Sequence, residues 1–244
     1  MTRPAVLSVV IPAFNEEAFI GTLLERVRAV DLSALGVATE IVVVDDCSTD
    51  DTARCAEAVP GVRVCRQAAN RGKGAAVRAG LARASGDYIV IQDADLEYDP
   101  EDYAPMLSEL LNTGCDAVYG SRYSVEPSRG RLGGLVTGKH AGQSWPAYIG
   151  GRSLSLVAYV CTGARLTDTV TALKLFRRTA ILDLPLTTDG FELDHEITAK
   201  LVARGRQIRE VPVRYAPRSR DEGKKIGARD WVAGVRTFAR FRRG

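Results

Sequence analysis

The first half of this 244-residue chain alternates short apolar segments with segments of helical periodicity, and this alternation limits the folds open to it. Residues 6–11 and 41–44 are nearly continuous aliphatic runs, which is typical of strands buried on both faces of a parallel sheet. Between them, apolar residues recur at helical spacing over residues 20–30. Further strands are predicted at 62–64, 88–92 and 117–119, and further helices at about 50–59, 74–84 and 100–111. Repeated β-α-β units predict an α/β fold with a mostly parallel sheet covered by helices.

Polar residues at the starts of two predicted helices are suited to accept hydrogen bonds from unpaired backbone N–H groups. We expect Asn15 to cap the helix over 20–30. Thr49 or Asp50 is expected to cap the helix that ends at Val59.

The alternation weakens beyond Gly120. Residues 130–151 are rich in glycine and polar side chains and predict a long loop. A helix over about 153–163 is expected to follow. A compact region over 168–213 is expected to contain another helix that ends near Ala203.

Composition is that of an ordinary globular protein, with 45% hydrophobic and 26% charged residues. The five cysteines are scattered and form no C-x-x-C pair, which argues against a disulfide framework and a zinc site and favours reduced thiols. The first residues lack a signal-peptide pattern, and no apolar run is long enough to cross a bilayer. We therefore expect a cytoplasmic protein.

Charge is unevenly distributed along the chain, whose net charge is +3. Residues 218–244 contain nine lysines and arginines against three acidic residues, so the remainder is mildly acidic. This basic end predicts an anionic partner, either phosphate or a lipid surface. We expect no nucleic-acid partner. The alternative is a charged end that is simply solvated.

Three polar clusters follow predicted strands. Residues 12–16 come after the first strand, Asp45 and Asp46 end the second, and Asp93 and Asp95 follow a third. Ligands of such sheets bind outside the carboxyl ends of the strands. The clusters are therefore expected to converge on one edge of the sheet and to form a binding site.

Asp93, Asp95 and Glu97 occupy alternate positions, and alternate side chains of an extended segment face the same side. Three adjacent carboxylates repel one another, and a divalent cation relieves that repulsion. Mg²⁺ and Mn²⁺ favour carboxylate oxygens together with substrate phosphates. The spacing thus predicts a metal site, and a solvated acidic turn is the alternative.

Two further segments carry polar chemistry. An acidic residue at Asp45 can accept hydrogen bonds from a base or ribose, although nearby residues are equally suited to helix capping. Residues 70–76 open a helix with two glycines and Lys73, which favours an anion at the helix N-terminus. The alternative for this second segment is a simple turn.

These segments together resemble family-2 glycosyltransferases of the Rossmann-like GT-A fold, and most closely the polyprenyl-phosphate hexosyltransferases such as dolichol-phosphate mannose and glucose synthases. The resemblance covers nearly the whole chain. Its N-terminal motifs lie at residues 12–16, 44–50, 70–74, 93–97 and 120–122. Its C-terminal motifs lie at residues 168–177, 190–194, 210–215 and 223–225.

The resemblance implies a role for each matching position. The nucleotide pocket would be lined by Pro12, Phe14, Glu16, Asp45 and Asp46. Mg²⁺ or Mn²⁺ on the diphosphate would be held by Asp93, Asp95 and Glu97. The acceptor phosphate would face Arg122, joined by Arg129 or Arg131. The diphosphate would be closed over by Arg218, Lys224 and Lys225. The sequence departs from the family pattern at two positions. Phe14 stands where a tyrosine is common, and Glu97 stands where mannose synthases often have glutamine. The glutamate slightly favours a glucose-type donor.

The implied reaction is the inverting transfer of a hexose from a GDP-mannose-type or UDP-glucose-type donor to a polyprenyl phosphate. Asp95 and Arg122 are the predicted catalytic residues, and Asp194 is a candidate base for a hydroxyl acceptor or else a helix cap. Alternatives are transfer to a soluble small-molecule or protein hydroxyl, a sugar-nucleotide pyrophosphorylase, and a nucleotide-binding regulator. The lone His140 and His195 are assigned to no metal.

Residues 1–217 are expected to form the GT-A domain, with a nucleotide-sugar half over about 1–122 and an acceptor half over about 123–217. Residues 218–244 form a basic segment with an amphipathic helix. One face of that helix carries Ala228, Trp231, Val232, Val235 and Phe238. Such a face is suited to the inner surface of a membrane, or to docking on the core. Leu154, Leu156, Val157 and Val160 are a second apolar surface or a homodimer contact.

Overall fold

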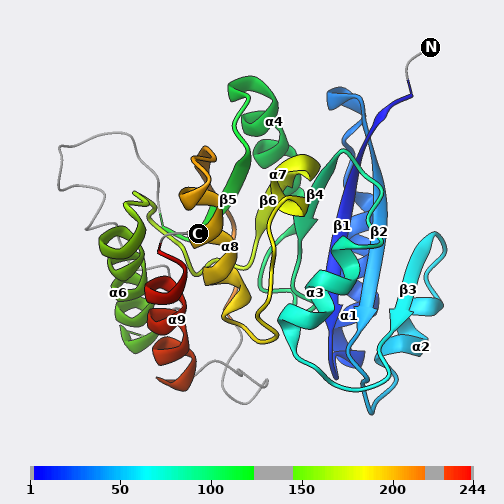
Figure 1. The fold of residues 1–244 in the computed structure, drawn as a ribbon. Helices are drawn as coiled ribbons and strands as arrows, with labels where there is room; N and C mark the ends of the chain where they lie inside the picture. Colours follow the sequence, from blue (N-terminus) through cyan, green and yellow to red (C-terminus); the bar gives the residue numbers. More distant parts are fainter. Residues whose placement is uncertain (1–2, 124–144, 218–227, 243–244) are drawn as a thin grey trace.

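The apolar runs form the strands of one seven-stranded sheet in a computed structural model that describes residues 3–123, 145–217 and 228–242 (Figure 1). The strands are β1 (Ala5–Ala13), β2 (Val37–Asp45), β3 (Val62–Arg66), β4 (Tyr88–Ile91), β5 (Ala117–Ser121), β6 (Lys174–Arg177) and β7 (Ile208–Pro212). Their order is β3-β2-β1-β4-β6-β5-β7. Strand β6 is antiparallel to β4 and β5, and the other pairs are parallel. The predicted α/β fold with a mostly parallel sheet is confirmed.

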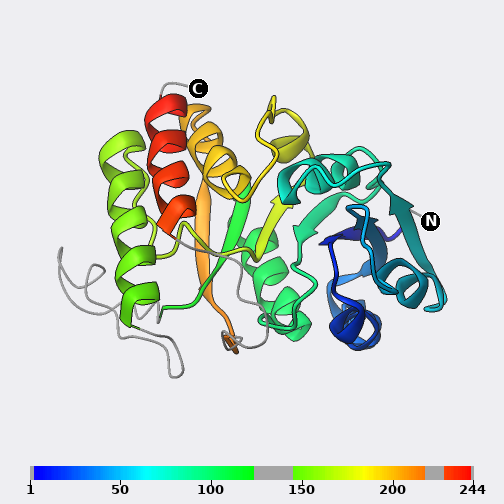
Figure 2. The same ribbon diagram turned by 90° about the horizontal axis from the view of Figure 1, so that it is seen from below.

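Helices cover both faces of this sheet (Figure 2). They are α1 (Glu17–Ala29), α2 (Thr52–Glu57), α3 (Lys73–Leu81), α4 (Tyr103–Thr113), α6 (Trp145–Thr162), α7 (Arg178–Leu182), α8 (Leu193–Ala203) and α9 (Ala228–Phe241), with short 3-10 helices η1 (Ser33–Leu35) and η2 (Pro100–Asp102). One apolar core joins α1 and α4 to the sheet, and a second core joins α3, α7 and α8 to its other face. Every helix and strand predicted before Gly120 is present.

The predicted cap at Asn15 is wrong. Helix α1 begins at Glu17 and its N-cap position is Glu16, whose side chain makes no capping hydrogen bond. Asn15 instead has a φ of 54°, and its side-chain oxygen accepts from the backbone N–H of Thr49 at 2.9 Å. The predicted cap of α2 at Thr49 or Asp50 is also wrong, because Asp51 occupies the N-cap position and makes no side-chain capping hydrogen bond. The carboxylate of Asp50 still accepts from the N–H of Thr52, the first residue of α2, at 3.0 Å.

The predicted loop over 130–151 is wrong for its last part, because α6 begins at Trp145. Gly150 and Gly151 lie inside the helix and made the segment resemble a loop. A Cβ added at Gly151 would lie 2.9 Å from the hydroxyl of Tyr123, so this glycine permits close packing of the helix against the end of β5. Residues 130–144 lie outside the described part of the chain.

Helix α9 docks on the body of the protein. Phe238 and Phe241 are buried and pack against Ala158 of α6 and Ala199 of α8. Of the two alternatives predicted for the apolar face of this helix, docking on the core is observed for Phe238, which is fully buried, whereas Trp231 and Val232 of the same predicted face are exposed. None of the described helices combines the length and apolar character required to cross a bilayer.

Candidate active site

The three polar clusters meet at one edge of the sheet, as predicted from the strand order. Ala13 at the end of β1 pairs with Asp45 at the end of β2. On the other side of β1, the N–H of Gln92 donates to the carbonyl of Val10 at 3.0 Å, which places Asp93 beside the end of β1. The carboxyl ends of β1, β2 and β4 thus bring residues 12–16, 45–46 and 93–95 into one region.

The loops after β1 and β2 are locked together by hydrogen bonds. The N–H of Asn15 donates to the hydroxyl of Ser48 at 3.0 Å, and the N–H of Glu17 donates to the carboxylate of Asp50 at 3.2 Å. The N–H of Asp51 in turn donates to the carboxylate of Glu17 at 2.9 Å. Each loop satisfies backbone donors of the other, so the positions of the two predicted nucleotide-pocket segments are coupled.

Asp46 organises the loop that precedes α3. Its carboxylate accepts from the N–H groups of Arg71 and Gly72 at 3.0 and 2.7 Å and from the side chain of Gln67 at 2.7 Å. Asp45 accepts from the N–H of Ser48 at 3.3 Å. Both aspartates are buried, so the structure gives Asp46 a supporting role that the sequence did not indicate.

The N-terminus of α3 is covered by the backbone of residues 188–190. The carbonyl of Asp189 accepts from the N–H of Ala75 at 3.1 Å, so that donor is not directed at a ligand. Gly72 has a φ of 94°, and a Cβ there would lie 2.6 Å from the same carbonyl oxygen. The glycines of this segment therefore allow one backbone to approach another closely.

Replacing Gly72 with alanine is expected to lower the free energy of unfolding by about 3 kcal/mol, because backbone strain and a steric clash add together. Gly61→Ala is the matched control, since Gly61 has a φ of 83° but nothing lies within 4 Å of an added Cβ. Strain alone predicts a loss of about 1 kcal/mol for the control. Urea unfolding followed by circular dichroism measures both, and equal losses would contradict the role given to close packing.

The expectation that an extended backbone aligns Asp93, Asp95 and Glu97 is wrong. Strand β4 ends at Ile91, and Leu96 has a φ of 59°, so the chain turns between the carboxylates. The carboxylate of Glu97 accepts from the hydroxyl of Tyr215 at 2.8 Å. Among the described residues, no group of three His, Cys, Asp or Glu side chains is placed to hold a metal ion.

A chain of alternating charges runs beneath this edge. The ammonium of Lys73 lies 2.7 Å from the carboxylate of Asp93 and 3.2 Å from that of Asp194. The ammonium of Lys174, which is fully buried, lies 2.9 Å from the other oxygen of Asp194 and donates to the carbonyl of Thr171 at 2.5 Å. The order is therefore Lys174, Asp194, Lys73, Asp93.

Burial and neighbouring charges set the protonation of these groups. Burial raises the pKa of Asp93, and the charges of Asp95 and Asp194 raise it further against the opposing effect of Lys73. Burial alone would raise the pKa of Asp194 as well, but Lys174 and Lys73 outweigh it and lower that pKa to about 2. Asp194 is thus held as a carboxylate, which makes it a weak base near neutral pH. Its helix-capping alternative is not observed either, because Glu192 occupies the N-cap of α8.

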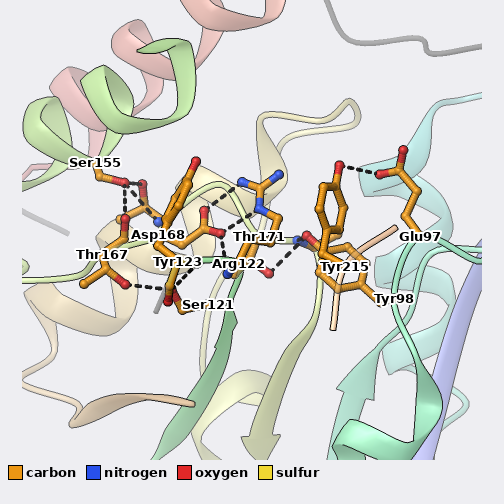
Figure 3. A network of polar contacts seen from close by, with 12 residues as sticks. Glu97, Tyr98, Ser121, Arg122, Tyr123, Ser155, Thr167, Asp168, Thr171 and Tyr215 are labelled. Atoms are coloured by element: carbon orange, nitrogen blue, oxygen red, sulfur yellow. Dashed lines mark hydrogen bonds and ion pairs between the residues drawn. The ribbon is translucent and has the colours of Figure 1, made fainter. Parts of the chain in front are cut away.

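Arg122 is held rigidly on the other side of β6 (Figure 3). Its guanidinium donates to both oxygens of Asp168 at 2.6 and 2.8 Å, and Asp168 is fully buried. The guanidinium carbon lies 5.2 Å from the ring centroid of Tyr215, whose hydroxyl reaches Glu97. A bidentate pair of this kind fixes the plane of the guanidinium, and its Nη1 group takes no part in the pair with Asp168.

Glu210 of β7 fixes the backbone of the segment that carries Asp168. Its carboxylate accepts from the N–H groups of Thr167 and Asp168 at 2.7 and 2.8 Å. No individual role was predicted from the sequence for Asp168, Lys174 or Glu210. A lysine between Leu173 and Leu175 was a usable indication, because a charge within an apolar strand requires a partner.

With this geometry established, comparison with known proteins identifies the family. The profile described as "Glycosyl transferase family 2" matches residues 8–180, which is well over half of the chain. The chain belongs to glycosyl transferase family 2. This match confirms the resemblance inferred from the motifs at the strand ends, and it includes β1 to β6 together with Asp168 and Lys174.

Two curated relatives are similar to much of this chain. A dolichol-phosphate mannosyltransferase of Pyrococcus furiosus is 32% identical over 231 residues, which are 91% of this chain and 59% of that protein. A dodecaprenyl-phosphate galacturonate synthase of Rhizobium johnstonii is 36% identical over 186 residues, which are 74% of this chain and 50% of that protein. The chain thus spans between half and about three fifths of the length of these two relatives.

A solved structure of similar fold is the glucosyl-3-phosphoglycerate synthase from Mycobacterium tuberculosis in complex with Mn²⁺, UDP-glucose and phosphoglyceric acid. Its TM-score to this chain is 0.65 at 26% sequence identity, over 96% of this chain and 80% of that chain. The fold therefore matches that of a synthase crystallised with a nucleotide sugar, a divalent metal and a phosphorylated acid.

Several residues that the family resemblance singled out lie outside the described part of the chain. These are Arg129, Arg131, Arg218, Lys224 and Lys225, and the lone His140 lies outside it as well. Within the described part, the structure brings together Phe14, Glu16, Asp45, Asp93 and Asp95 at the strand ends. Their individual roles in family-2 chemistry stay predictions.

Proposed function

We propose that the protein transfers a hexose from a nucleotide sugar of the GDP-mannose or UDP-glucose type to the phosphate of a polyprenyl phosphate. The proposal rests on the different environments of two residues predicted to act on the acceptor, Asp194 and Arg122. Asp194 is tied to two lysines with a pKa of about 2, whereas Arg122 presents a fixed guanidinium. A hydroxyl acceptor requires a base, while a phosphate is already an oxyanion that requires positioning by a cation.

The donor would lie across the strand ends, with its nucleoside near Pro12, Phe14, Glu16 and Asp45. Asp93 and Asp95 suit Mg²⁺ or Mn²⁺ in this arrangement, because two carboxylates with substrate phosphates form a typical site for such a cation. The charge of Asp95 raises the pKa of Asp93. This repulsion between two carboxylates fits a site that binds a cation. Bound there, the cation supplies positive charge that stabilises the departing diphosphate.

The chain's own residues bind and orient both substrates. An oxygen of the acceptor phosphate, positioned by Arg122, attacks the anomeric carbon as the bond from that carbon to the diphosphate breaks. The nucleoside diphosphate leaves with the electron pair, no proton moves, and the anomeric configuration inverts. Lys73, held between Asp93 and Asp194, lies where its charge stabilises the diphosphate oxygens.

The proposal extends to the organisation and location of the chain. Residues 1–217 would act as the GT-A catalytic domain, with residues 218–244 as a basic appended segment. A lipid acceptor places the enzyme at the cytoplasmic face of a membrane, without a described helix that crosses it.

A second acceptor class is favoured by one specific observation. The solved structure of similar fold carries phosphoglyceric acid, which is a soluble phosphorylated acceptor. Arg122 is chemically suited to either kind of phosphate.

An assay of GDP-mannose and UDP-glucose against several acceptors tests the proposal. With Mn²⁺ present, we expect transfer to a polyprenyl phosphate and little to 3-phosphoglycerate or to a polyprenol that lacks the phosphate. Product is measured by mass spectrometry, and NMR of the anomeric proton determines the configuration. Transfer to the polyprenol as efficient as to its phosphate would exclude the role given to Arg122.

A further inference from the structure

The most exposed large apolar side chains of the described residues gather on the outer face of α6. Trp145, Ile149 and Val160 are 64, 60 and 75% exposed, and Leu156 is 49% exposed. With 3.6 residues per turn, these four positions fall within about 60° of arc on the helix. The opposite side of α6, which includes Leu154 and Ala158, is buried. These four exposed residues are called the α6 face below.

The α6 face lies at the edge of the molecule. In both ribbon views α6 is the outermost helix, with α9 beside it (Figures 1 and 2). Helix α9 extends the apolar area with Trp231 and Val232, which are partly exposed. The indole N–H of Trp231 donates to the hydroxyl of Ser153 at 2.9 Å, so the two helices present one joined surface.

A row of aromatic rings connects this face to the acceptor arginine. The ring centroids of Trp145 and Tyr148 are 5.9 Å apart, and those of Tyr148 and Tyr123 are 5.6 Å apart. The guanidinium carbon of Arg122 lies 5.9 Å from the centroid of Tyr123. Side-chain contacts through the buried ring of Tyr123 therefore link the α6 face to the residue proposed to bind the acceptor phosphate.

Charge and side-chain type near the α6 face favour a lipid occupant. Residues 145–162 contain no aspartate or glutamate, so no acidic side chain of this helix repels an anionic surface. The neighbouring helix α9 carries two exposed arginines, Arg236 and Arg240, which line a pocket together with Thr188 and Glu192. An anionic lipid surface attracts basic side chains on such a neighbouring helix, and tryptophan is favoured at the boundary between headgroups and acyl chains.

We propose that the α6 face is a membrane-docking surface that inserts its apolar side chains into an anionic bilayer. Docking there holds Arg122 close to the headgroup level, where the phosphate of a lipid acceptor lies. The role of the bilayer as the source of the acceptor rests on the proposed function, while docking itself rests on the exposed surfaces of α6 and α9.

Vesicle flotation of the full chain tests the proposal. The probe is a vesicle of phosphatidylcholine with about one third phosphatidylglycerol, free of any polyprenyl phosphate. The double variant Ile149→Asp/Val160→Asp is expected to lower the partition coefficient about tenfold or more, because two apolar anchors become charged. Leu182→Asp is the matched control, since Leu182 is an exposed apolar residue on α7. Its partitioning is expected to equal that of the unmodified chain.

The outcomes separate this proposal from the proposed function. Vesicle binding that is absent in the unmodified chain, or unaffected by the double variant, overturns docking through α6 even if transfer to polyprenyl phosphate in detergent is observed. Vesicle binding without any transfer would leave docking standing and defeat the proposed acceptor. In the remaining outcome, the unmodified chain dimerises and does not bind vesicles, while the double variant is monomeric. Sedimentation velocity detects this outcome, which also overturns docking. Circular dichroism confirms that each variant is folded.

Discussion

Replacing Asp95 with alanine is expected to lower the turnover number for hexose transfer by about a thousandfold, while the protein remains folded. Asp95 follows the end of β4, and its charge acts directly on the pKa of Asp93. Loss of this carboxylate removes one of two oxygen-donor side chains proposed to hold the cation on the diphosphate. The electrostatic stabilisation of the leaving group is lost with it, and no binding energy elsewhere replaces it.

The test compares Asp95→Ala with Glu101→Gln. Glu101 is an exposed carboxylate in η2, six positions further along the chain. Turnover is measured as a function of Mn²⁺ concentration, and nucleotide-dependent Mn²⁺ binding is measured separately by isothermal titration calorimetry. Undiminished turnover in Asp95→Ala, or unchanged Mn²⁺ binding in the presence of nucleoside diphosphate, would rule out the role proposed for this residue.

Local sequence patterns predicted the first half of the fold because its elements are determined by short-range periodicity. Residues 6–11 and 41–44 are apolar enough to be recognised as buried strands without knowledge of their partners, and they form the centres of β1 and β2. Strand β6 was missed, since it is four residues long and contains Lys174. Its position between β4 and β5 depends on pairing with strands more than fifty residues away, which no local pattern records.

The candidate site was predicted in its location but not in its internal contacts. The rule that ligands bind at the carboxyl ends of strands brought Asp45, Asp93 and Asp95 to one edge correctly. It gave no information on how each charge is balanced. Lys73 is adjacent to Asp93 only because the fold places the start of α3 beside the end of β4. Such pairings arise from tertiary packing, so the sequence offered Asp194 as a candidate base without indicating its two lysine partners.

The first turns of helix α6 were predicted as a loop, and here too tertiary packing decides the conformation. Gly150 and Gly151 predicted a loop, because glycine destabilises an isolated helix by about 1 kcal/mol relative to alanine. Packing overrides that preference here, since a side chain at Gly151 would collide with Tyr123. Tertiary contact therefore decides the conformation of a segment whose local propensity indicates otherwise.

Replacing Asp194 with asparagine is expected to lower the free energy of unfolding by about 4 kcal/mol at pH 7, because two buried ammonium groups lose their shared counter-ion. Asp194 lies between Lys73 and Lys174 at 3.2 and 2.9 Å, and the side chain of Lys174 is fully buried. Asp183→Asn is the matched control. Asp183 pairs with Arg204 and Arg206 at the exposed surface, where such a change is expected to cost less than about 1 kcal/mol.

The effect depends on pH in a direction fixed by the lowered pKa of Asp194. Its ordinary pKa is 3.8 and its folded pKa is about 2, so its stabilising contribution is fully present above about pH 4. It is lost as the pH falls through 2, and the difference in stability between the unmodified chain and Asp194→Asn is expected to shrink over that interval. Urea unfolding at pH 7, 4 and 3 measures this difference.

The same variant distinguishes a positioning role from a catalytic base. A base must titrate near the working pH, and it then produces an acid limb in the pH profile of the turnover number. Because Asp194 stays ionised throughout pH 5–8, we expect the profile of Asp194→Asn to keep the shape of the unmodified enzyme while its KM for the nucleotide sugar rises through displacement of Lys73. Disappearance of an acid limb in the variant would identify Asp194 as the base, and it would then favour a hydroxyl acceptor over the phosphate that Arg122 is proposed to bind.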